Sequence, residues 1–351
     1  MIDFRSDNVH TIADPVLKEM IEANNNTVAS YGGDELTKNA KEMLSEIFNK
    51  EIDSFFVSTG TAANSLSLAS ITPEYGTIFC GSDSHIYLEE CNAPEFFSNS
   101  AKLYPVKTEG GKIIYGELEK ALLFHPSDEF DMVASSLSIS QATEAGTIYK
   151  QDEIRNLKNI ADSKKLKIHM DGARFANVVA ATDKKPQELT WEAGVDVMSF
   201  GTTKNGTMSA EAVIFFNTNL SKKTNLYIKR SGHLLSKMRF ISSQIIGYLK
   251  NDLWIELARS ANKKANLLSE NLNKFDFIHL PWQTEINEVF IIVPKELENY
   301  LKNHKVSCHN WTKISLDEQY HKDNYSFLRL VTSFNSNEDD IYKLAEMIEN
   351  F

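Results

Sequence analysis

Two charged residues stand where strand-like segments end, and their types suit one chemistry. Lys204 follows an apolar run and lies among small and hydroxyl-bearing neighbours in the segment Ser199-Phe-Gly-Thr-Thr-Lys-Asn-Gly206. Asp171 ends the segment Lys167-Ile-His-Met-Asp171, and Arg174 follows it three positions later. A lysine amine can join an aldehyde as a Schiff base, and a carboxylate can hold a heterocyclic nitrogen protonated.

An amine and a carboxylate in these positions predict a site for pyridoxal 5'-phosphate (PLP). The cofactor withdraws electrons from a bound amino acid only while its ring nitrogen is protonated, which requires a carboxylate partner such as Asp171. Lys204 is the candidate for covalent attachment. Taken alone, a lysine in a Gly/Thr loop is most often a solvated turn residue, so the prediction depends on the other groups.

A turn rich in small residues is a candidate phosphate cradle. The segment Ser58-Thr-Gly-Thr-Ala-Ala-Asn64 joins a strand-like run to an apolar helical one, so the backbone N–H groups of Gly60, Thr61 and Ala62 would point from a helix N-terminus toward a phosphate. No Gly-Lys-Ser/Thr follows, and the Gly-x-Gly-x-x-Gly pattern is absent from this turn, so neither nucleotide fingerprint applies. A purely structural turn is the alternative.

Further candidates are a histidine and two arginines. His85 could stack on a pyridine ring and, with a pKa near ~6.5, move a proton at neutral pH, although a loop histidine can also be ordinary surface. Arg329 interrupts an apolar strand. Its guanidinium could bind a substrate carboxylate through bidentate hydrogen bonds, or it could face water from an edge strand. Arg230 could supply charge to a phosphate, or belong to a solvated helix face.

The elements that must position these groups alternate along the first two thirds of the chain. Strands are expected at 53–57, 77–80, 101–106, 132–139, 167–170, 195–200 and 210–216. Helices are expected at 14–23, 61–71, 115–124, 152–164 and 186–193. This alternation predicts an α/β fold with a mainly parallel sheet covered by helices on both faces. Such sheets bind ligands beyond the carboxyl ends of their strands, where Asp171, Lys204 and the Gly60 turn all lie.

The character of the chain changes after about residue 231. A long helical stretch at 253–275 precedes strands at 289–293 and 327–331 and a last helix at 338–349. We therefore expect a large domain at 1–240 that carries the cofactor site and a smaller α+β domain at 241–351. Because no Pro/Gly-rich linker separates them, the position of this boundary is approximate.

Composition excludes several classes of protein. The 351 residues carry 37 basic and 48 acidic side chains, a formal charge of −11, which argues against broad binding to nucleic acid or to an anionic membrane. Three cysteines without metal-ligand spacing predict neither a metal site nor a disulfide framework, and favour a reducing compartment. The N-terminal residues lack a signal-peptide pattern, so a cytoplasmic location is expected.

Motifs along the chain resemble the threonine aldolase/β-eliminating lyase family, which comprises PLP enzymes of the aspartate aminotransferase fold type. The motifs are Phe4-Arg-Ser-Asp-Asn8, Tyr31-Gly-Gly-Asp34, Val57-Ser-Thr-Gly-Thr61, Ser84-His85, Gln141-Ala-Thr-Glu144, His169-Met-Asp-Gly-Ala-Arg174, Ser199-Phe-Gly-Thr-Thr-Lys-Asn-Gly206 and Arg230-Ser-Gly-His233. The Gly-Thr-Thr-Lys-Asn-Gly form resembles the branch known as low-specificity L-threonine aldolase. A better-known branch has Ser-Lys-Gly around the lysine and Thr in place of Asn8.

The resemblance implies a role for each matching residue. Lys204 would hold the cofactor, Asp171 would pair with the ring nitrogen, and Arg174 would lie near the ring hydroxyl. The remaining roles would be phosphate binding by Gly60, Thr61 and a hydroxyl of Thr202 or Thr203, ring stacking by His85, and contact with the substrate carboxylate and its surroundings by Ser6, Gln141 and Arg329. Tyr31 and Arg230 would serve the cofactor of a neighbouring subunit, because the site lies between subunits in this fold type, as a homodimer or homotetramer.

The activity implied is retro-aldol cleavage of L-threonine and L-allo-threonine to glycine and acetaldehyde, with His85 as the favoured base. Two alternatives stay open at this point. The chain could instead catalyse β-elimination from another amino acid or transfer of its side chain, or it could be a non-catalytic PLP-binding module. The products separate the first alternative from the aldolase, since elimination releases pyruvate and ammonia.

Overall fold

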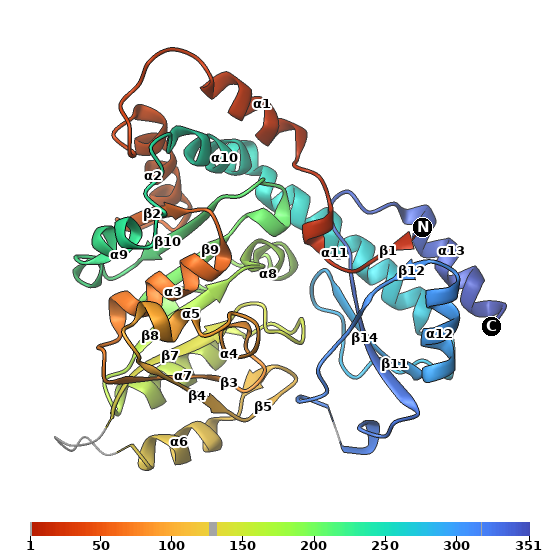
Figure 1. Cartoon of the computed structure of the whole chain (residues 1–351). Helices are drawn as coiled ribbons and strands as arrows, with labels where there is room; N and C mark the ends of the chain where they lie inside the picture. The colour runs from red at the N-terminus through yellow and green to blue at the C-terminus, as the bar shows by residue number, and fades with distance from the viewer. Residues whose placement is uncertain (1, 126–131, 317) are drawn as a thin grey trace.

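The computed structural model describes residues 2–125, 132–316 and 318–351, and its larger part is built on a seven-stranded sheet (Figure 1). The strand order is β2-β10-β9-β8-β7-β3-β4, and β10 is antiparallel to both of its neighbours while the other pairs are parallel. The strands are β2 (Asp53–Val57), β3 (Gly76–Gly81), β4 (Lys102–Val106), β7 (Val133–Ser140), β8 (Lys167–Gly172), β9 (Val197–Gly201) and β10 (Glu211–Phe215). The predicted α/β class with a mainly parallel sheet is confirmed.

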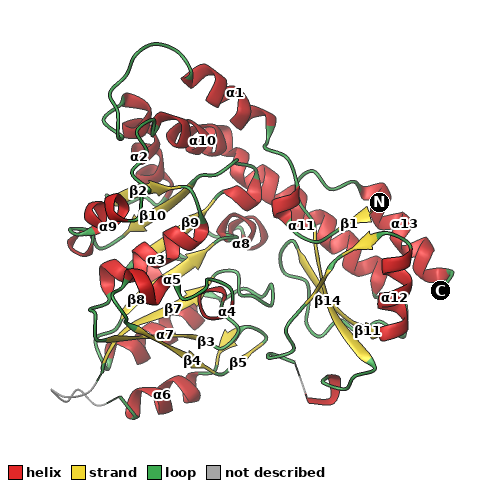
Figure 2. Ribbon diagram, viewed as in Figure 1, coloured by secondary structure: helices red, strands yellow, loops and turns green. Residues whose placement is uncertain are grey.

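Helices cover both faces of this sheet (Figure 2). One of them, α3 (Gly60–Ile71), packs against β8, β9 and β10 and is buried nearly all round, because α5 (Ala93–Phe97) and α9 (Thr224–Arg230) cover its outer side. This explains why the apolar residues of α3 are not confined to one stripe. The other helices of these layers are α6 (Tyr115–Leu123), α7 (Gln151–Asp162) and α8 (Phe175–Thr182).

A further helical layer lies beside β2. In it α10 (Arg239–Leu249) packs on both α1 (Asp14–Ala23) and α2 (Glu35–Ile47). As predicted, α1 begins at Asp14 with a proline in its first turn, where a missing N–H costs nothing. The N-cap of α2 is Asp34, whose carboxylate accepts hydrogen bonds from the N–H and the hydroxyl of Thr37, both at 2.9 Å.

The C-terminal part contains a small antiparallel sheet. The strand order of this sheet is β11-β14-β13. The elements of the C-terminal part are α11 (Leu253–Leu272), β11 (Glu288–Pro294), α12 (Lys295–Asn303), β13 (His309–Asn310), β14 (Tyr325–Val331) and α13 (Glu338–Glu349). The boundary at residue 240 stays a prediction. The helix that spans it, α10, packs on α1 and α2, and the long helix α11 contacts both α8 and α13.

The N-terminal segment belongs to the C-terminal part as well as to the site. Strand β1 (Ile2–Asp3) pairs in parallel with β12 (Val306–Ser307), and the two lie side by side in Figure 1. The carbonyl of Phe4 accepts a 2.8 Å hydrogen bond from the N–H of Val331. The residues that follow, Ser6 to Asn8, are therefore held at the junction of the two sheets.

The prediction of a helix at 186–193 is wrong. Only a single 3-10 turn, Trp191–Ala193, forms there. The hydroxyl of Thr190 donates to the carbonyl of Pro186 at 2.7 Å, and Gly194 ends the turn with φ +105°. The Thr190 hydroxyl thus takes a carbonyl acceptor that a backbone N–H would use in a helix, as hydroxyl side chains often do in turns.

Within the described residues, no helix combines the length and the apolar character needed to cross a bilayer.

Candidate active site

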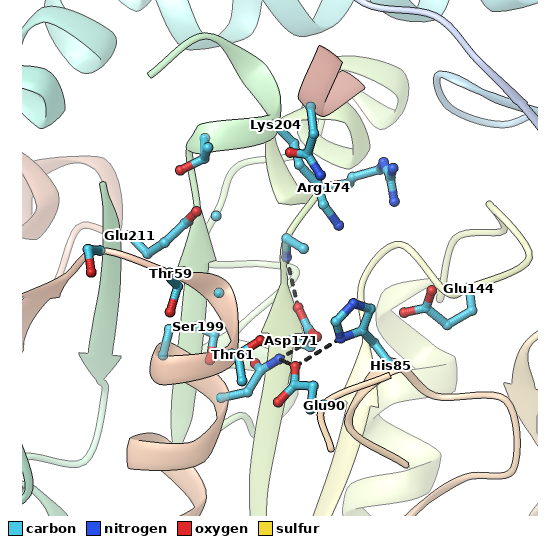
Figure 3. Close-up of a pocket in the computed structure, with 18 of the residues that line it drawn as sticks. Thr59, Thr61, His85, Glu90, Glu144, Asp171, Arg174, Ser199, Lys204 and Glu211 are labelled. Atoms are coloured by element: carbon cyan, nitrogen blue, oxygen red, sulfur yellow. Dashed lines mark hydrogen bonds and ion pairs between the residues drawn. The ribbon is translucent and has the colours of Figure 1, made fainter. Parts of the chain in front are cut away.

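A cavity of about 310 Å³ opens where β2, β8 and β9 end (Figure 3). Ligand pockets for small molecules begin at about this volume. Of the predicted site residues, the cavity wall includes Gly60, Thr61, His85, Asp171, Arg174, Thr203 and Lys204. Residues that the sequence prediction gave no role also line it: Asn8, Ser58, Thr59, Asn64, Glu90, Glu144, Ser199 and Glu211.

Lys204 lies on a 3-10 turn (Thr203–Asn205) directly after β9. The next residue, Asn205, is buried and donates from Nδ2 to the hydroxyl of Tyr248 and to the carbonyl of Trp254, both at 2.8 Å. These bonds direct Asn205 into the core, and Gly206 then turns the chain back with φ +120°. Lys204, which precedes both residues, lines the cavity.

Asp171 lies at the carboxyl end of β8 and is 6% exposed. Its Oδ2 accepts from Asn64 Nδ2 at 2.8 Å, and its Oδ1 accepts from the Ala173 N–H at 3.0 Å. Two donors fix the orientation of the carboxylate, so a cationic ring nitrogen brought to it would meet a preset partner. Asn64 comes from α3, one turn beyond Gly60.

The N-terminus of α3 forms the phosphate-sized end of the site. Neither Gly60 nor Thr61 has a hydrogen-bond acceptor for its N–H among the described residues, and a Cβ at Gly60 would meet no atom within 4 Å. The N–H of Ala62 differs, because it donates to the Thr59 hydroxyl at 3.2 Å in an N-cap. The expectation that Ala62 also offers its N–H to a phosphate stays a prediction, while Gly60 and Thr61 supply two N–H groups that have no acceptor among the described residues.

Thr202 and Thr203 have different surroundings. Thr202 is fully buried, and its hydroxyl bonds to the Ala210 carbonyl and to the Thr207 hydroxyl. Thr203 lines the cavity. The structure thus brings Thr203, and not Thr202, to the site.

His85 begins the short helix α4 (His85–Leu88) and bonds through Nδ1 to Oε1 of Glu90 at 2.9 Å. Burial lowers the pKa of the imidazole, but the hydrogen bond to Glu90 and the nearby carboxylates of Glu144 and Asp171 outweigh burial and raise the pKa above 6.5. Sequence reasoning singled out His85 but missed Glu90. The His-x-x-x-x-Glu spacing on one loop was the available signal.

Arg174 is buried in a network of ion pairs. Its Nε and Nη2 donate to the two oxygens of Asp7 at 2.9 and 3.1 Å, and its Nη1 lies 3.1 Å from Oε1 of Glu288. The pKa of this guanidinium is raised, because the two carboxylates outweigh the effect of burial. The proposed contact with a ring hydroxyl stays a prediction, since Arg174 lines the cavity while its charge is already paired.

Arg329 lies in a second cavity, of about 370 Å³, that shares Asn8, His85, Glu144, Arg174 and Lys204 with the first. Its guanidinium stacks on Trp311, 3.8 Å from the ring centroid, and Nη1 donates to Glu288 at 3.4 Å. Nε is buried and has no partner among the described residues. Ser6 lines the same cavity. These two predicted substrate contacts are therefore brought next to Lys204.

Three further predicted site residues lie outside both cavities. Gln141 is fully buried, and its amide oxygen and nitrogen bond to the N–H and carbonyl of Tyr149 at 3.0 and 2.8 Å. Gln141 lines neither cavity, although Ala142 and Glu144 line the first, and its contact with the substrate carboxylate stays a prediction. Tyr31 (52% exposed) and the exposed Arg230 lie outside both cavities, and their expected role in a neighbouring subunit stays a prediction.

Two carboxyl groups on the wall have unusual acidity. Burial raises the pKa of Glu144 to about 7, although His85 and Lys204 oppose the rise. Burial also raises the pKa of Glu211 to about 7, and its Oε2 accepts from the N–H of Thr202 at 2.9 Å. Perturbed carboxyl groups in a cavity are typical of sites that move protons. Among the described residues, no group of three His, Cys, Asp or Glu side chains is placed to hold a metal ion.

Solved structures with the same architecture define the class of fold. A structure of Leishmania major threonine aldolase superposes with a TM-score of 0.91 at 24% identity, covering 100% of this chain and 99% of that chain. The histidinol-phosphate aminotransferase of Clostridium acetobutylicum gives 0.74 at 16% identity, covering 100% and 98%. The fold is that of the PLP-dependent enzymes of fold type I.

Sequence comparison narrows the class to a family. The family model for beta-eliminating lyases matches residues 3–296, so the chain belongs to the beta-eliminating lyase family. It is 38% identical to a low specificity L-threonine aldolase of Pseudomonas aeruginosa over 82% of this chain and 83% of that protein. It is 37% identical to a second protein of that name from a Pseudomonas species, over 86% of each. The family predicted from the motifs is confirmed.

Proposed function

We propose that this chain is a carbon–carbon lyase that cleaves L-threonine and L-allo-threonine to glycine and acetaldehyde with PLP. The observation that carries the proposal is the convergence of Lys204, Asp171 and His85 on one cavity. The two Pseudomonas relatives named low specificity L-threonine aldolase support the substrate and the reaction. Assembly as a homodimer or homotetramer and a cytoplasmic location belong to the same proposal.

The donor set fits PLP. The free N–H groups of Gly60 and Thr61, at the positive end of a helix, suit a phosphate dianion. The fixed, buried carboxylate of Asp171 suits a protonated ring nitrogen, and Lys204 would hold the cofactor aldehyde through Nζ. The chemistry supplied by bound PLP is an electron sink for the pair released when the Cα–Cβ bond breaks.

The chain's own side chains would orient the substrate and move its protons. Arg329 lines the same cavity as Lys204, and its buried Nε has no partner in the described part of the chain, so it would bind the substrate carboxylate and fix the direction of the Cα–Cβ bond. His85 would accept the proton of the β-hydroxyl at Nε2, because Nδ1 is engaged by Glu90. Its pKa is raised by the hydrogen bond to Glu90 and by the carboxylates of Glu144 and Asp171, which makes the imidazole a stronger proton acceptor.

The decisive experiment combines product analysis with mapping of the attachment site. Protein purified with PLP should release acetaldehyde and glycine from threonine, and borohydride reduction followed by peptide mass mapping should find the adduct on Lys204. Lys204→Ala should fold normally, trap no cofactor and lose more than ~10³-fold in kcat. An adduct on another lysine, or full activity in this variant, contradicts the assignment.

The same assays separate the alternatives. Pyruvate and ammonia in place of acetaldehyde would identify β-elimination. A protein that binds PLP but leaves every β-hydroxy amino acid unchanged would be a non-catalytic binding module. Lys223→Ala, which changes an exposed lysine before α9, is the matched control for both assays.

A further inference from the structure

We propose that Glu90 is the positioning residue of His85, and that its carboxylate fixes the imidazole tautomer whose Nε2 is free to accept a proton in the cavity. The proposal deepens the proposed function, because it concerns the residue expected to act as its base. Glu90 itself contacts His85 and is not a proton acceptor for the substrate.

The hydrogen-bond pattern defines the tautomer. Glu90 Oε1 lies 2.9 Å from His85 Nδ1 and also accepts from Asn64 Nδ2 at 2.8 Å. An ionised carboxylate can only accept hydrogen bonds, so with Glu90 ionised its Oε1 accepts from both the Asn64 amide and His85 Nδ1. Nδ1 must then carry the hydrogen, which leaves the lone pair on Nε2 in the neutral imidazole.

Burial distinguishes the two partners. The Glu90 side chain is 0% exposed and the His85 side chain is 36% exposed, so the carboxylate lies behind the ring and the ring faces the cavity. In Figure 3 the imidazole stands between Glu90 on one side and Glu144 on the other. A buried carboxylate behind a solvent-facing imidazole is the arrangement that orients a general base.

Asn64 fixes Glu90 and links it to the other end of the site. Its Nδ2 donates to both Glu90 Oε1 and Asp171 Oδ2, each at 2.8 Å. The helix that offers N–H groups at Gly60 and Thr61 therefore also holds, one turn later, the carboxylates behind His85 and at the end of β8 (Figure 3). This amide therefore couples the positions of the two carboxylates.

The charges around His85 come from four elements. The groups that act on it are Glu90 from its own loop, Glu144 from the loop after β7, Asp171 from β8 and Lys204 from the turn after β9. Within this set Glu90 alone hydrogen-bonds to the ring. Removing the charge of Glu90 while keeping its shape should therefore lower the pKa of His85 and leave the tautomer in place.

Two substitutions separate the charge from the hydrogen bond. Glu90→Gln keeps an acceptor at Oε1, and Glu90→Leu removes it. In apoprotein labelled with 15N-histidine, and with the His85 signals assigned by loss in His85→Asn, two-bond correlation spectra give tautomer and pKa directly. We expect Nδ1–H in the wild type, the same tautomer with a pKa lower by about one unit in Glu90→Gln, and a mixture of tautomers in Glu90→Leu.

Kinetics of the PLP-loaded enzyme give the second measurement. Loss of a hydrogen-bond partner of a functional histidine typically lowers activity about 10–100-fold. We therefore expect kcat for threonine cleavage to fall by about 10–100-fold in Glu90→Leu, while KM stays within about twofold. The control is Glu95→Gln, a half-buried carboxylate of α5 with no bond to His85. In Glu95→Gln the tautomer and pKa of His85, and the kcat of the enzyme, should equal those of the wild type.

The two measurements fail independently. An unchanged His85 tautomer in Glu90→Leu, or an unchanged His85 pKa in Glu90→Gln, overturns the positioning role. A changed tautomer with unchanged kcat also overturns it as a role in the reaction. If the wild type cleaves no threonine but the spectra change as expected, the proposed function fails while the link between Glu90 and the His85 tautomer stands.

Discussion

Asp7 and Arg174, which lie 167 positions apart in the sequence, form a buried ion pair through two hydrogen bonds. The pair joins the N-terminal segment to the end of β8, where Asp171 faces the cavity. Both side chains are almost fully shielded, with 2% and 7% exposure. The contact therefore fixes a wall of the site from two distant parts of the chain.

Removing the charge of Asp7 should destabilise the protein strongly. In Asp7→Asn a buried guanidinium keeps one carboxylate partner, Glu288, and loses the other, so the free energy of unfolding should fall by about 3 kcal/mol. The control is Asp3→Asn, which breaks the more exposed pair with Arg5 in the same segment and should cost less than about 1 kcal/mol. Urea unfolding monitored by fluorescence measures both, and equal losses would contradict the prediction.

The same pair predicts a component of acid sensitivity. Burial raises the pKa of Asp7, but Arg174, Lys204 and Asn287 outweigh it and hold the pKa below the ordinary 3.8. A carboxyl group with a depressed pKa in the folded state stabilises it above the unfolded-state value, and this contribution disappears as the pH falls through the folded-state pKa. Stability should therefore drop below about pH 4 more steeply in the wild type than in Asp7→Asn. Parallel slopes in urea titrations between pH 5 and 2.5 would argue against it.

The acid limb of the pH–rate profile should depend on Glu144. Its carboxylate faces His85 and contributes to raising the imidazole pKa, and burial brings its own pKa to about 7. Glu144→Gln removes this charge, so the acid limb of kcat/KM should move to lower pH by roughly one unit. Glu117→Gln, on the surface of α6, should leave the limb in place. An unmoved limb in Glu144→Gln would show that the carboxylate does not act on the base.

Arg329 should affect substrate affinity more than cofactor affinity. Its guanidinium is held by Trp311 and Glu288 beside Lys204, and a lysine cannot reproduce the planar fork. Arg329→Lys should raise KM for threonine by about 10–100-fold, the equivalent of one charged hydrogen bond. PLP affinity from absorbance titration should stay within about threefold of the wild type. Arg155→Lys, exposed on α7, is the control, and equal KM values for the two variants would contradict the prediction.

The sequence was sufficient to predict the groups placed by strand ends. Asp171, Lys204 and Gly60 each follow a strand directly, and parallel strands bring their carboxyl ends to one edge of a sheet, so local pattern and a general topological rule predict their convergence. The last helix, Glu338–Glu349, was predicted with the bounds it has, because its Asn337 cap and apolar periodicity are local signals.

Partners joined through tertiary contacts could not be predicted in this way. Glu90 and Asn64 are 26 positions apart, and no periodicity shows that one amide bridges Glu90 and Asp171. Gln141 shows the same limit, since its amide group bonds to the backbone of Tyr149 across a turn. The burial of Arg174 also depends on residues from both ends of the chain. Each of these features concerns which side chain or backbone group occupies a hydrogen-bonding position, and none of them concerns the fold.

The pairing of β1 with β12 has a consequence for biosynthesis. Residues 2–8 are synthesised long before the residues that they contact, because Ile2 pairs with Val306 and Phe4 bonds to Val331. While domains form during translation, the partners of Ile2 and Phe4 become available only after residues 306–331 have been made. The large sheet can therefore form before the segment that carries Asp7 is anchored beside Arg174, and this wall of the cavity is completed late.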